Sequence, residues 1–395
     1  SGIIGDSQPG PQTGLPERYQ LMADSLGGDM VSTSTGSFCL VHTNFPCDGI
    51  ADSRPLVGNG EYDRESLPVT AFTVEHEPGV MPVSSLVFVD TETTGLGGVG
   101  TVAFLIGCGS VVDGQFEVRQ YIIPDYADEA AMLEALQEEF GEGKVLVTYN
   151  GAAFDLPVLR DRMIVNRVAR DIAMSRHIDL LHPVRRLFRR RLKDCTLVNV
   201  ERELLRFERS DDIPGYLIPS LYFEWLSEQN LELMHTVLRH NRRDVVSLYY
   251  VTVLIAQAYE TQGATLEAVD DIYSLSRLFG RRREHLTVTR LYERLDESAE
   301  GHLDADVLLF HAQAFKRAGR YEKAVELWER LAGRSSREAY QANIELAIHY
   351  EHRVRDAAVA RHHARQAQRI GPTSAKQAEA LRHRIARLQG KLRKP

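Results

Sequence analysis

The chain has 395 residues, of which 43% are hydrophobic and 26% charged, a composition typical of a globular protein with two or three domains. Its four cysteines have no CxxC spacing, which argues against a disulfide framework or a zinc knuckle and favours a reducing cytoplasm. The apolar run "YYVTVLIAQAY" is too short to cross a bilayer, so we expect no membrane span.

The net charge of −8 is distributed unevenly along the chain. Residues 301–395 contain 19 Lys and Arg against 10 Asp and Glu, whereas the remainder is acidic. An acidic body with a basic C-terminal part suggests that the tail meets an acidic polymer or a protein partner. Solvated, arginine-rich helix faces are the alternative explanation.

Residues 1–83 are rich in Gly, Pro, Ser and Asp and have little periodicity, which predicts an irregular N-terminal arm. Two short strands are expected within it, "SFCLVH" at 37–42 and "VTAFTVEH" at 69–76. The sequence indicates no function for this arm.

Residues 84–262 change to alternating strand and helix patterns and are expected to form an α/β domain. Three leading strands are followed by a helix, another strand and then mostly helices, which predicts a mixed sheet flanked by helices. The expected ranges are 85–90, 101–112 and 116–123 for the strands, 128–140 for the helix and 144–150 for the next strand.

The first of these strands ends in "DTET", which places Asp90 and Glu92 two residues apart on one face. Two like charges on one face repel each other unless a cation or water lies between them. The pair is therefore either a solvated strand end or half of a metal site.

Three more polar residues, at the start of one later helix and on one face of another, are candidates for the same site. The Asn150-Gly151 turn leads into a helix near Leu156, so Asp155 lies where a carboxylate can bind a metal or cap exposed N–H groups. On a later long helix, His240 and Asp244 are four residues apart and share one face. Exposed helices often carry such pairs, so each signal alone is weak.

A basic run, "RRLFRRRLK", follows "HIDLLHP" on an expected helix. Its density of cations suggests a track for phosphates, and a solvated helix face is the alternative. The candidate phosphate contacts are Arg185, Arg186, Arg189, Arg190 and Arg191. Asp179, just before the run, is either a support for the site or a local cap.

Residues 263–395 read as helices only. Segment 305–333 has apolar residues at helical spacing and a break at "RAGRY", and 337–370 repeats this with a break near "EHRVRD". The spacing resembles tetratricopeptide hairpins, which stack into concave surfaces for partners, and a basic final helix at 375–394 would cap the stack. A plain helical bundle serving as structural support is the alternative.

In this order, the motifs resemble those of the DEDD, or DnaQ-like, 3′–5′ exonucleases of the ribonuclease H-like superfamily. They look most like the YprB-type ribonuclease H-like domain, over roughly Ser84 to Glu260. The segments that carry this resemblance are "DTETTGL", "GTVAFLIG", "VTYNGAAFD", "IDLLHPVRRLF", "DIPGYLIPSLYFEWL" and "HNRRDVVSL".

The resemblance implies that two divalent cations are held by the four acids Asp90, Glu92, Asp155 and Asp244. Oxygen ligands of this kind suit Mg²⁺ or Mn²⁺. It also makes His240 a candidate general base, although the chain departs from the family here. The histidine subtype places its His five residues before the last Asp, whereas this chain has His at the four-residue spacing of the tyrosine subtype. His240 therefore acts as base, orients water or only packs.

Two functions from different classes follow. The first is a metal-dependent 3′–5′ exonuclease acting on single-stranded ends of DNA or RNA, with Thr91, Tyr149 and Asn150 beside the terminal nucleotide. The second is a catalytically weak or inactive nucleic-acid-binding or scaffold protein that acts through its helical tail. Retention of all four acids favours the nuclease, because a binding domain has no need of clustered carboxylates that repel phosphate.

Overall fold

In the computed structural model of this protein, the chain divides into two units. Unit 1 contains residues 1–185 and 192–256, and unit 2 contains residues 186–191 and 257–395. None of the described helices is long and apolar enough to cross a membrane. The described residues are 16–46, 65–73, 79–95, 100–168, 176–298, 303–334 and 336–393.

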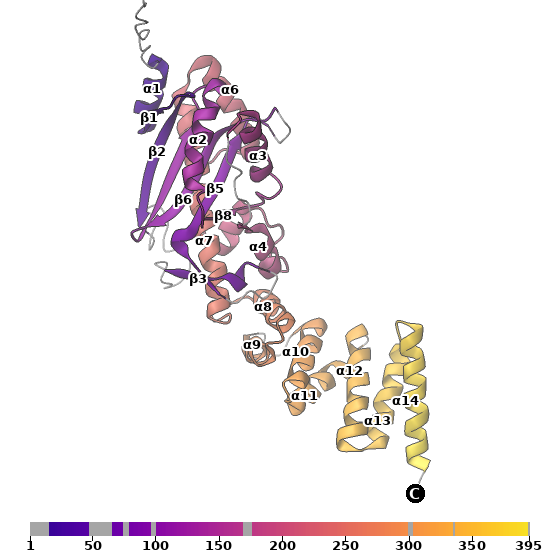
Figure 1. The fold of residues 1–395 in the computed structure, drawn as a ribbon. Coiled ribbons are helices and arrows are strands. Elements are labelled where there is room, and N and C mark those ends of the chain that lie inside the picture. Colours follow the sequence, from indigo (N-terminus) through magenta and orange to yellow (C-terminus); the bar gives the residue numbers. More distant parts are fainter. Residues whose placement is uncertain are drawn as a thin grey trace, which may run out of the picture. The chain divides into compact units, whose positions relative to one another are not determined.

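Unit 1 is built on a seven-stranded mixed sheet in the order β1-β2-β7-β6-β5-β8-β9 (Figure 1). The meander β5–β6–β7 is antiparallel, whereas β8 lies parallel to both β5 and β9. This confirms the predicted mixed sheet with flanking helices. The strands are β1 (Asp29–Ser32), β2 (Ser37–Pro46), β5 (Leu86–Thr93), β6 (Ala103–Val112), β7 (Gln115–Ile122), β8 (Val145–Thr148) and β9 (His177–Asp179).

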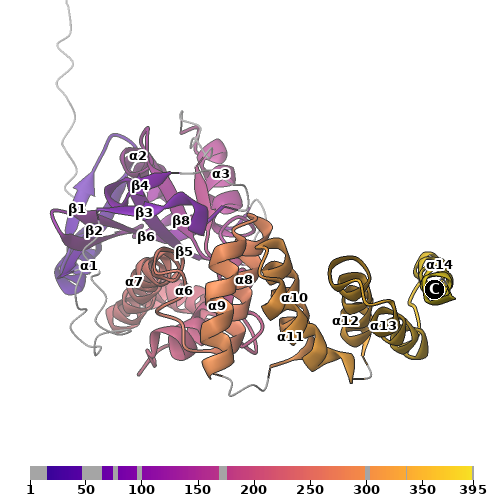
Figure 2. The same cartoon turned by 90° about the horizontal axis from the view of Figure 1, so that it is seen from below.

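One face of the sheet is covered by the long helix α7 (Leu231–Glu260), and the other by α2 (Glu129–Glu139) and α3 (Asp155–Val165) (Figure 2). Two glycines in β6 allow α7 to approach closely. A Cβ atom at Gly107 would lie 2.3 Å from Asn241 Oδ1, and one at Gly109 would lie 2.6 Å from Val245 Cγ1. The sequence of β6 therefore determines how near α7 lies to the sheet.

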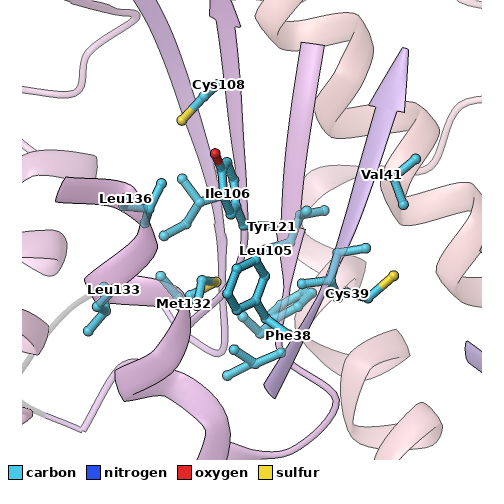
Figure 3. Close-up of a cluster of buried hydrophobic side chains, with 14 of the residues drawn as sticks. Phe38, Cys39, Val41, Leu105, Ile106, Cys108, Tyr121, Met132, Leu133 and Leu136 are labelled. Carbon is cyan, nitrogen blue, oxygen red and sulfur yellow. The ribbon is translucent and has the colours of Figure 1, made fainter. Parts of the chain in front are cut away.

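The opposite face is held by apolar side chains from β2, β6 and α2 (Figure 3). Phe38, Ile106 and Leu133 are each at most 1% exposed. Burial of each such side chain contributes about 1.5–3 kcal/mol, so this core fixes the sheet on which the polar residues of β5 lie.

The N-terminal part is more regular than the sequence suggested. The strand expected at 37–42 is confirmed and extends to Pro46 as β2, which pairs with β7 as part of the large sheet. Ahead of it lie α1 (Glu17–Leu26) and β1. Residues 17–46 are thus integral to unit 1.

The second strand expected in this region, at 69–76, is wrong where the structure describes it. Residues Val69–Ala71 form a 3₁₀ turn, because the N–H groups of Phe72 and Thr73 both donate to Val69 O, at 3.0 and 3.2 Å. Residues 74–76 lie outside the described residues. Short strands on either side, β3 (Ser66–Pro68) and β4 (Val80–Pro82), pair into a separate two-stranded sheet.

Between β9 and α7 the chain is mostly helical. It contains α4 (Leu181–Phe188), α5 (Leu197–Val200), a π-helical turn (Glu201–Leu205), a 3₁₀ turn (Gly215–Leu217) and α6 (Ile218–Glu228). The segment 206–214, which joins the π-helical turn to the 3₁₀ turn, is irregular and is referred to below as the 206–214 loop.

Among its described residues after residue 260, unit 2 contains seven helices, each of which contacts the next (Figure 1). The predicted all-helical region and its two breaks are confirmed, and the second break is a π-helical turn (Tyr350–Val354). Its identity as a tetratricopeptide-like repeat stays a prediction. The helices are α8 (Val269–Arg281), α9 (His285–Ser298), α10 (Ala305–Arg317), α11 (Tyr321–Ala332), α12 (Arg337–His349), α13 (Ala357–Ile370) and α14 (Ala375–Arg393).

Candidate active site

Carboxylates from three elements of unit 1 face one another. Asp90 and Glu92 lie on the face of β5 that is turned toward α7, because Phe88 on the same face contacts Tyr249 of α7 with ring centroids 5.7 Å apart. Asp244 belongs to α7, and the first residue of α3 is Asp155. Together these four acids form the carboxylate cluster.

Burial and repulsion by neighbouring carboxylates raise the pKa values of Asp90 and Glu92. The pKa of Asp90 is raised well above its ordinary value by burial and by the charges of Asp244, Glu92 and Asp155. Burial, reinforced by Asp244 and Asp155, raises the pKa of Glu92 to about 8, although His240 and Arg209 act in the opposite direction. Asp90 and Glu92 therefore bind protons readily. A metal cation that entered the cluster would compete with those protons for the carboxylates.

Three of these carboxylates accept hydrogen bonds from protein donors. Thr91 Oγ1 donates to Asp155 Oδ1 at 2.6 Å, and the Thr91 N–H donates to the same oxygen at 3.2 Å. Asn241 Nδ2 donates to Asp90 Oδ2 at 2.8 Å, and an Arg209 N–H donates to Asp244 Oδ1. These Thr91 bonds turn the carboxylate of Asp155 toward β5, and the N-cap residue of α3, Phe154, makes no side-chain cap hydrogen bond.

The donors in the carboxylate cluster suit a hard divalent cation, since all are oxygens. The turn before α3 is packed closely against Asp155, because a Cβ at Gly151 would lie only 2.9 Å from Asp155 Oδ2 and 2.3 Å from Thr148 Oγ1, too near for any residue but glycine. Among the described residues, however, no three His, Cys, Asp or Glu side chains already form a group that could hold a metal ion. The residues fit the ion chemically, and three of the four carboxylates are hydrogen-bonded to protein donors in this arrangement.

His240 lies beside the cluster and is held by Asp212 of the 206–214 loop. His240 Nδ1 is 2.9 Å from Asp212 Oδ1, and His240 Nε2 is 3.8 Å from Asp244 Oδ2. Burial lowers the pKa of His240, but the hydrogen bond to Asp212 and the nearby charges of Asp244 and Glu92 outweigh it and raise the pKa overall. His240 is therefore a largely buried ring directed at the carboxylate cluster.

Arg209 connects this loop to α7. Its Nε and one N–H donate to the two carboxylate oxygens of Glu201, both at 2.6 Å, and another N–H donates to Asp212 Oδ2 at 2.9 Å. The side chain of Arg209 is 5% exposed and also binds Asp244. Burial lowers the pKa of Arg209, but these carboxylates raise it well above its ordinary value, so the group stays charged.

Comparison with known proteins agrees with this architecture. Residues 87–256, which run from β5 to α7, match the RNase_H superfamily. The uncharacterized protein YprB of Bacillus subtilis (strain 168) is 34% identical over 318 residues, covering 78% of this chain and 75% of YprB. The chain belongs to the YprB family of the RNase_H superfamily.

In this RNase_H domain, the expected nucleotide contacts already have roles within the protein. Tyr149 Oη donates to Cys195 O at 2.6 Å. The N–H groups of Asn150, Ala152 and Leu181 donate to the carboxylate of Asp179, at 2.8, 3.2 and 3.1 Å. Asp179 is thus a local cap, the second of the two roles expected for it. It fixes the turn that precedes α3.

The basic run of this YprB-family chain contains arginines with an aspartate partner and arginines without one among the described residues. Arg190 donates to Asp270 Oδ1 at 2.9 Å and to Asp306 Oδ2 at 3.0 Å, and Arg191 donates to Asp271 Oδ2 at 2.8 Å. These pairs lie within unit 2 and give both arginines a structural role. Arg186 is half-buried, and Arg185 and Arg189, which are exposed, have no ion pair among the described residues.

Sequence reasoning missed Arg209, Asp212, Glu201 and Asn241. The segment "DIPGYLIPSLYFEWL" carries part of the family resemblance and begins at Asp212, but the sequence alone assigns Asp212 no place in the site, and Arg209 lies before the segment. Asn241 has no exposed surface and lies three residues before Asp244. A polar residue at a buried helical position was the available signal for it.

Proposed function

We propose that this protein is a divalent-metal-dependent nuclease that hydrolyses phosphodiester bonds, acting as a 3′–5′ exonuclease on single-stranded ends of nucleic acid. The observation that carries the proposal is the buried carboxylate cluster, in which Asp90, Glu92, Asp155 and Asp244 repel one another. Membership of the RNase_H superfamily supports a nucleic-acid substrate. A fold that is used for several activities does not by itself select one.

In this proposal the four carboxylates hold two ions, Mg²⁺ or Mn²⁺. When bound, the ions would lower the pKa of an attacking water and stabilise the leaving oxygen. His240 accepts the proton of that water through Nε2. Thr91 keeps Asp155 turned toward β5. The Tyr149-Asn150 turn lies ahead of α3, and the 3′ end of the nucleic acid would lie beside this turn.

The remaining assignments concern substrate and partners. Arg185 and Arg189 are the proposed phosphate contacts of the basic run, because they are exposed and unpaired with acids in the described chain. The helical unit would dock a protein partner. We place the activity in the cytoplasm, since Cys39, Cys108 and Cys195 are free thiols; Cys47 lies outside the described residues.

The test is cleavage of 5′-labelled single-stranded DNA, single-stranded RNA and duplex, with Mg²⁺, Mn²⁺ or EDTA. A descending ladder that requires metal supports the exonuclease, whereas internal cuts would show an endonuclease. Asp90→Asn and Asp155→Asn should abolish cleavage, and Mn²⁺ should raise their melting temperatures less than it raises that of the wild type. The matched control is Asp113→Asn, since Asp113 is exposed and has a φ of 47°, which asparagine adopts readily.

The scaffold alternative has one observation in its favour. An Arg209 N–H donates to Asp244 Oδ1, so a cation of the protein itself already contacts one of the four acids. If the wild type showed neither metal-dependent cleavage nor a melting temperature that depends on Mn²⁺, the nuclease proposal would be wrong. Tight binding of nucleic acid without cleavage would then support the scaffold.

A further inference from the structure

The 206–214 loop delivers charged side chains to the candidate active site. It begins after a π-helical turn, and Arg206 and Asp211 both have a φ of 55°, so the chain reverses sharply at each. We infer that Asp212 of this loop is a positioning residue that aims His240 at the scissile phosphodiester. This inference rests on the proposed nuclease function.

The contact between Asp212 and His240 determines which ring nitrogen faces the site. Asp212 Oδ1 lies 2.9 Å from Nδ1, so Nδ1 carries the hydrogen and donates it to the carboxylate. Nε2 is left as the nitrogen that faces the carboxylate cluster, 3.8 Å from Asp244 Oδ2. A Cβ at Gly215 would lie 4.0 Å from Nε2, so the glycine leaves this side of the ring open.

Asp212 is itself held firmly. Its second oxygen accepts from Arg209 at 2.9 Å, and Arg209 is bound through two hydrogen bonds to Glu201, whose side chain is fully buried. Rotation of the Asp212 carboxylate would break its bond to either Arg209 or His240. The loop therefore holds the ring in one orientation before any substrate arrives.

This orientation gives His240 a defined part in hydrolysis. As the water oxygen forms its bond to phosphorus, its proton moves to Nε2, and the bond from phosphorus to the leaving 3′ oxygen breaks. The leaving oxygen takes a proton from solvent. Asp212 touches neither water nor phosphate, and its effect is exerted through the ring.

The experiment combines proton NMR of the metal-free full-length protein with steady-state kinetics. Wild type should show a hydrogen-bonded imidazole Nδ1–H resonance that disappears in His240→Gln and in Asp212→Ala. Asp212→Asn should lower kcat by about 10- to 100-fold while KM for a short oligonucleotide stays within about twofold. The matched control is Asp211→Asn, the same substitution at the exposed neighbouring residue, which should alter neither the resonance nor kcat.

The readouts separate positioning from a merely structural role. If wild type lacked the resonance, or if Asp212→Asn kept full kcat, the inference would be overturned. Loss of fold in an Asp212 variant would not obscure the result, because the wild-type resonance and its loss in His240→Gln are measured independently. If wild type cleaved nothing with Mg²⁺ or Mn²⁺, the proposed function would fail, and the resonance would still decide whether Asp212 orients the ring.

Discussion

Replacing Gly107 by alanine tests whether β6 sets the position of α7. Gly107 is paired with Asp90 across the antiparallel strands β5 and β6. An added Cβ would lie 2.3 Å from Asn241 Oδ1 and 2.8 Å from Val245 Cγ2, whereas ordinary contacts begin near 3.4 Å. Helix α7 would have to withdraw by about 1 Å, or Asn241 would have to leave its place.

The expected loss of stability follows from these contacts. Overpacking of a well-packed core costs about 1–3 kcal/mol. The hydrogen bonds that Asn241 makes with Asp90 and Gln120, at 2.8 and 2.9 Å, would be strained, each contributing about 0.5–1.5 kcal/mol. We expect a total near 3 kcal/mol, which lowers the melting temperature of a unit of this size by about 6–12 °C.

The assay is thermal unfolding of Gly107→Ala followed by circular dichroism, with Gly141→Ala as the matched control. The only heavy atom within 4 Å of a Cβ at Gly141 among the described residues is Glu138 O, at an ordinary 3.5 Å. Its melting temperature should therefore equal or slightly exceed that of the wild type, because alanine restricts the unfolded chain. Equal melting temperatures for the two variants would refute the argument that Gly107 admits α7.

Two further predictions concern unit 2. Arg191→Gln should destabilise the helical unit by about 3 kcal/mol in chemical denaturation, because Asp271 would be left buried without its cation, whereas exposed Arg189→Gln should change stability by less than about 0.5 kcal/mol. Equal effects would show that the basic run is uniformly solvated. The hydrogen bond from Arg387, with other cations, lowers the pKa of Glu351 to about 2, below its unfolded value near 4.5, so its stabilisation is complete above pH 4.5 and declines as the pH falls toward 2. The wild type should be more stable than Glu351→Gln by about 1–3 kcal/mol at pH 7. In urea titrations this difference should become smaller between pH 4.5 and pH 2, and a difference that stays constant would contradict the prediction.

Local patterns were sufficient to predict much of the fold. The apolar run that ends at Asp90 predicts a strand, and the break at "RAGRY" predicts a helix boundary, because both signals are contained in a few neighbouring residues. Strand β9 was missed because it has only three residues. The participation of β2 in the large sheet was missed because its partner, β7, lies far along the chain.

The candidate site shows the same division between local and distant information. The spacing of His240 and Asp244 on one helix face was visible in the sequence. The pairing of His240 with Asp212 was not visible in the sequence, since the two residues are separated by 28 positions and by a helix. Arg191 likewise looked like a free cation, because its partner Asp271 is 80 residues away.

The chain passes from one unit to the other three times, at residues 185/186, 191/192 and 256/257. A stop codon after residue 256 would remove helices α8 and α10 but leave Arg190 and Arg191 behind, without the aspartates that bind them. The helical unit therefore cannot be added or removed by a single cut near the C-terminal end, because it also includes residues 186–191. A chimera that exchanges it between relatives has to carry residues 186–191 from the same parent, together with everything after residue 256.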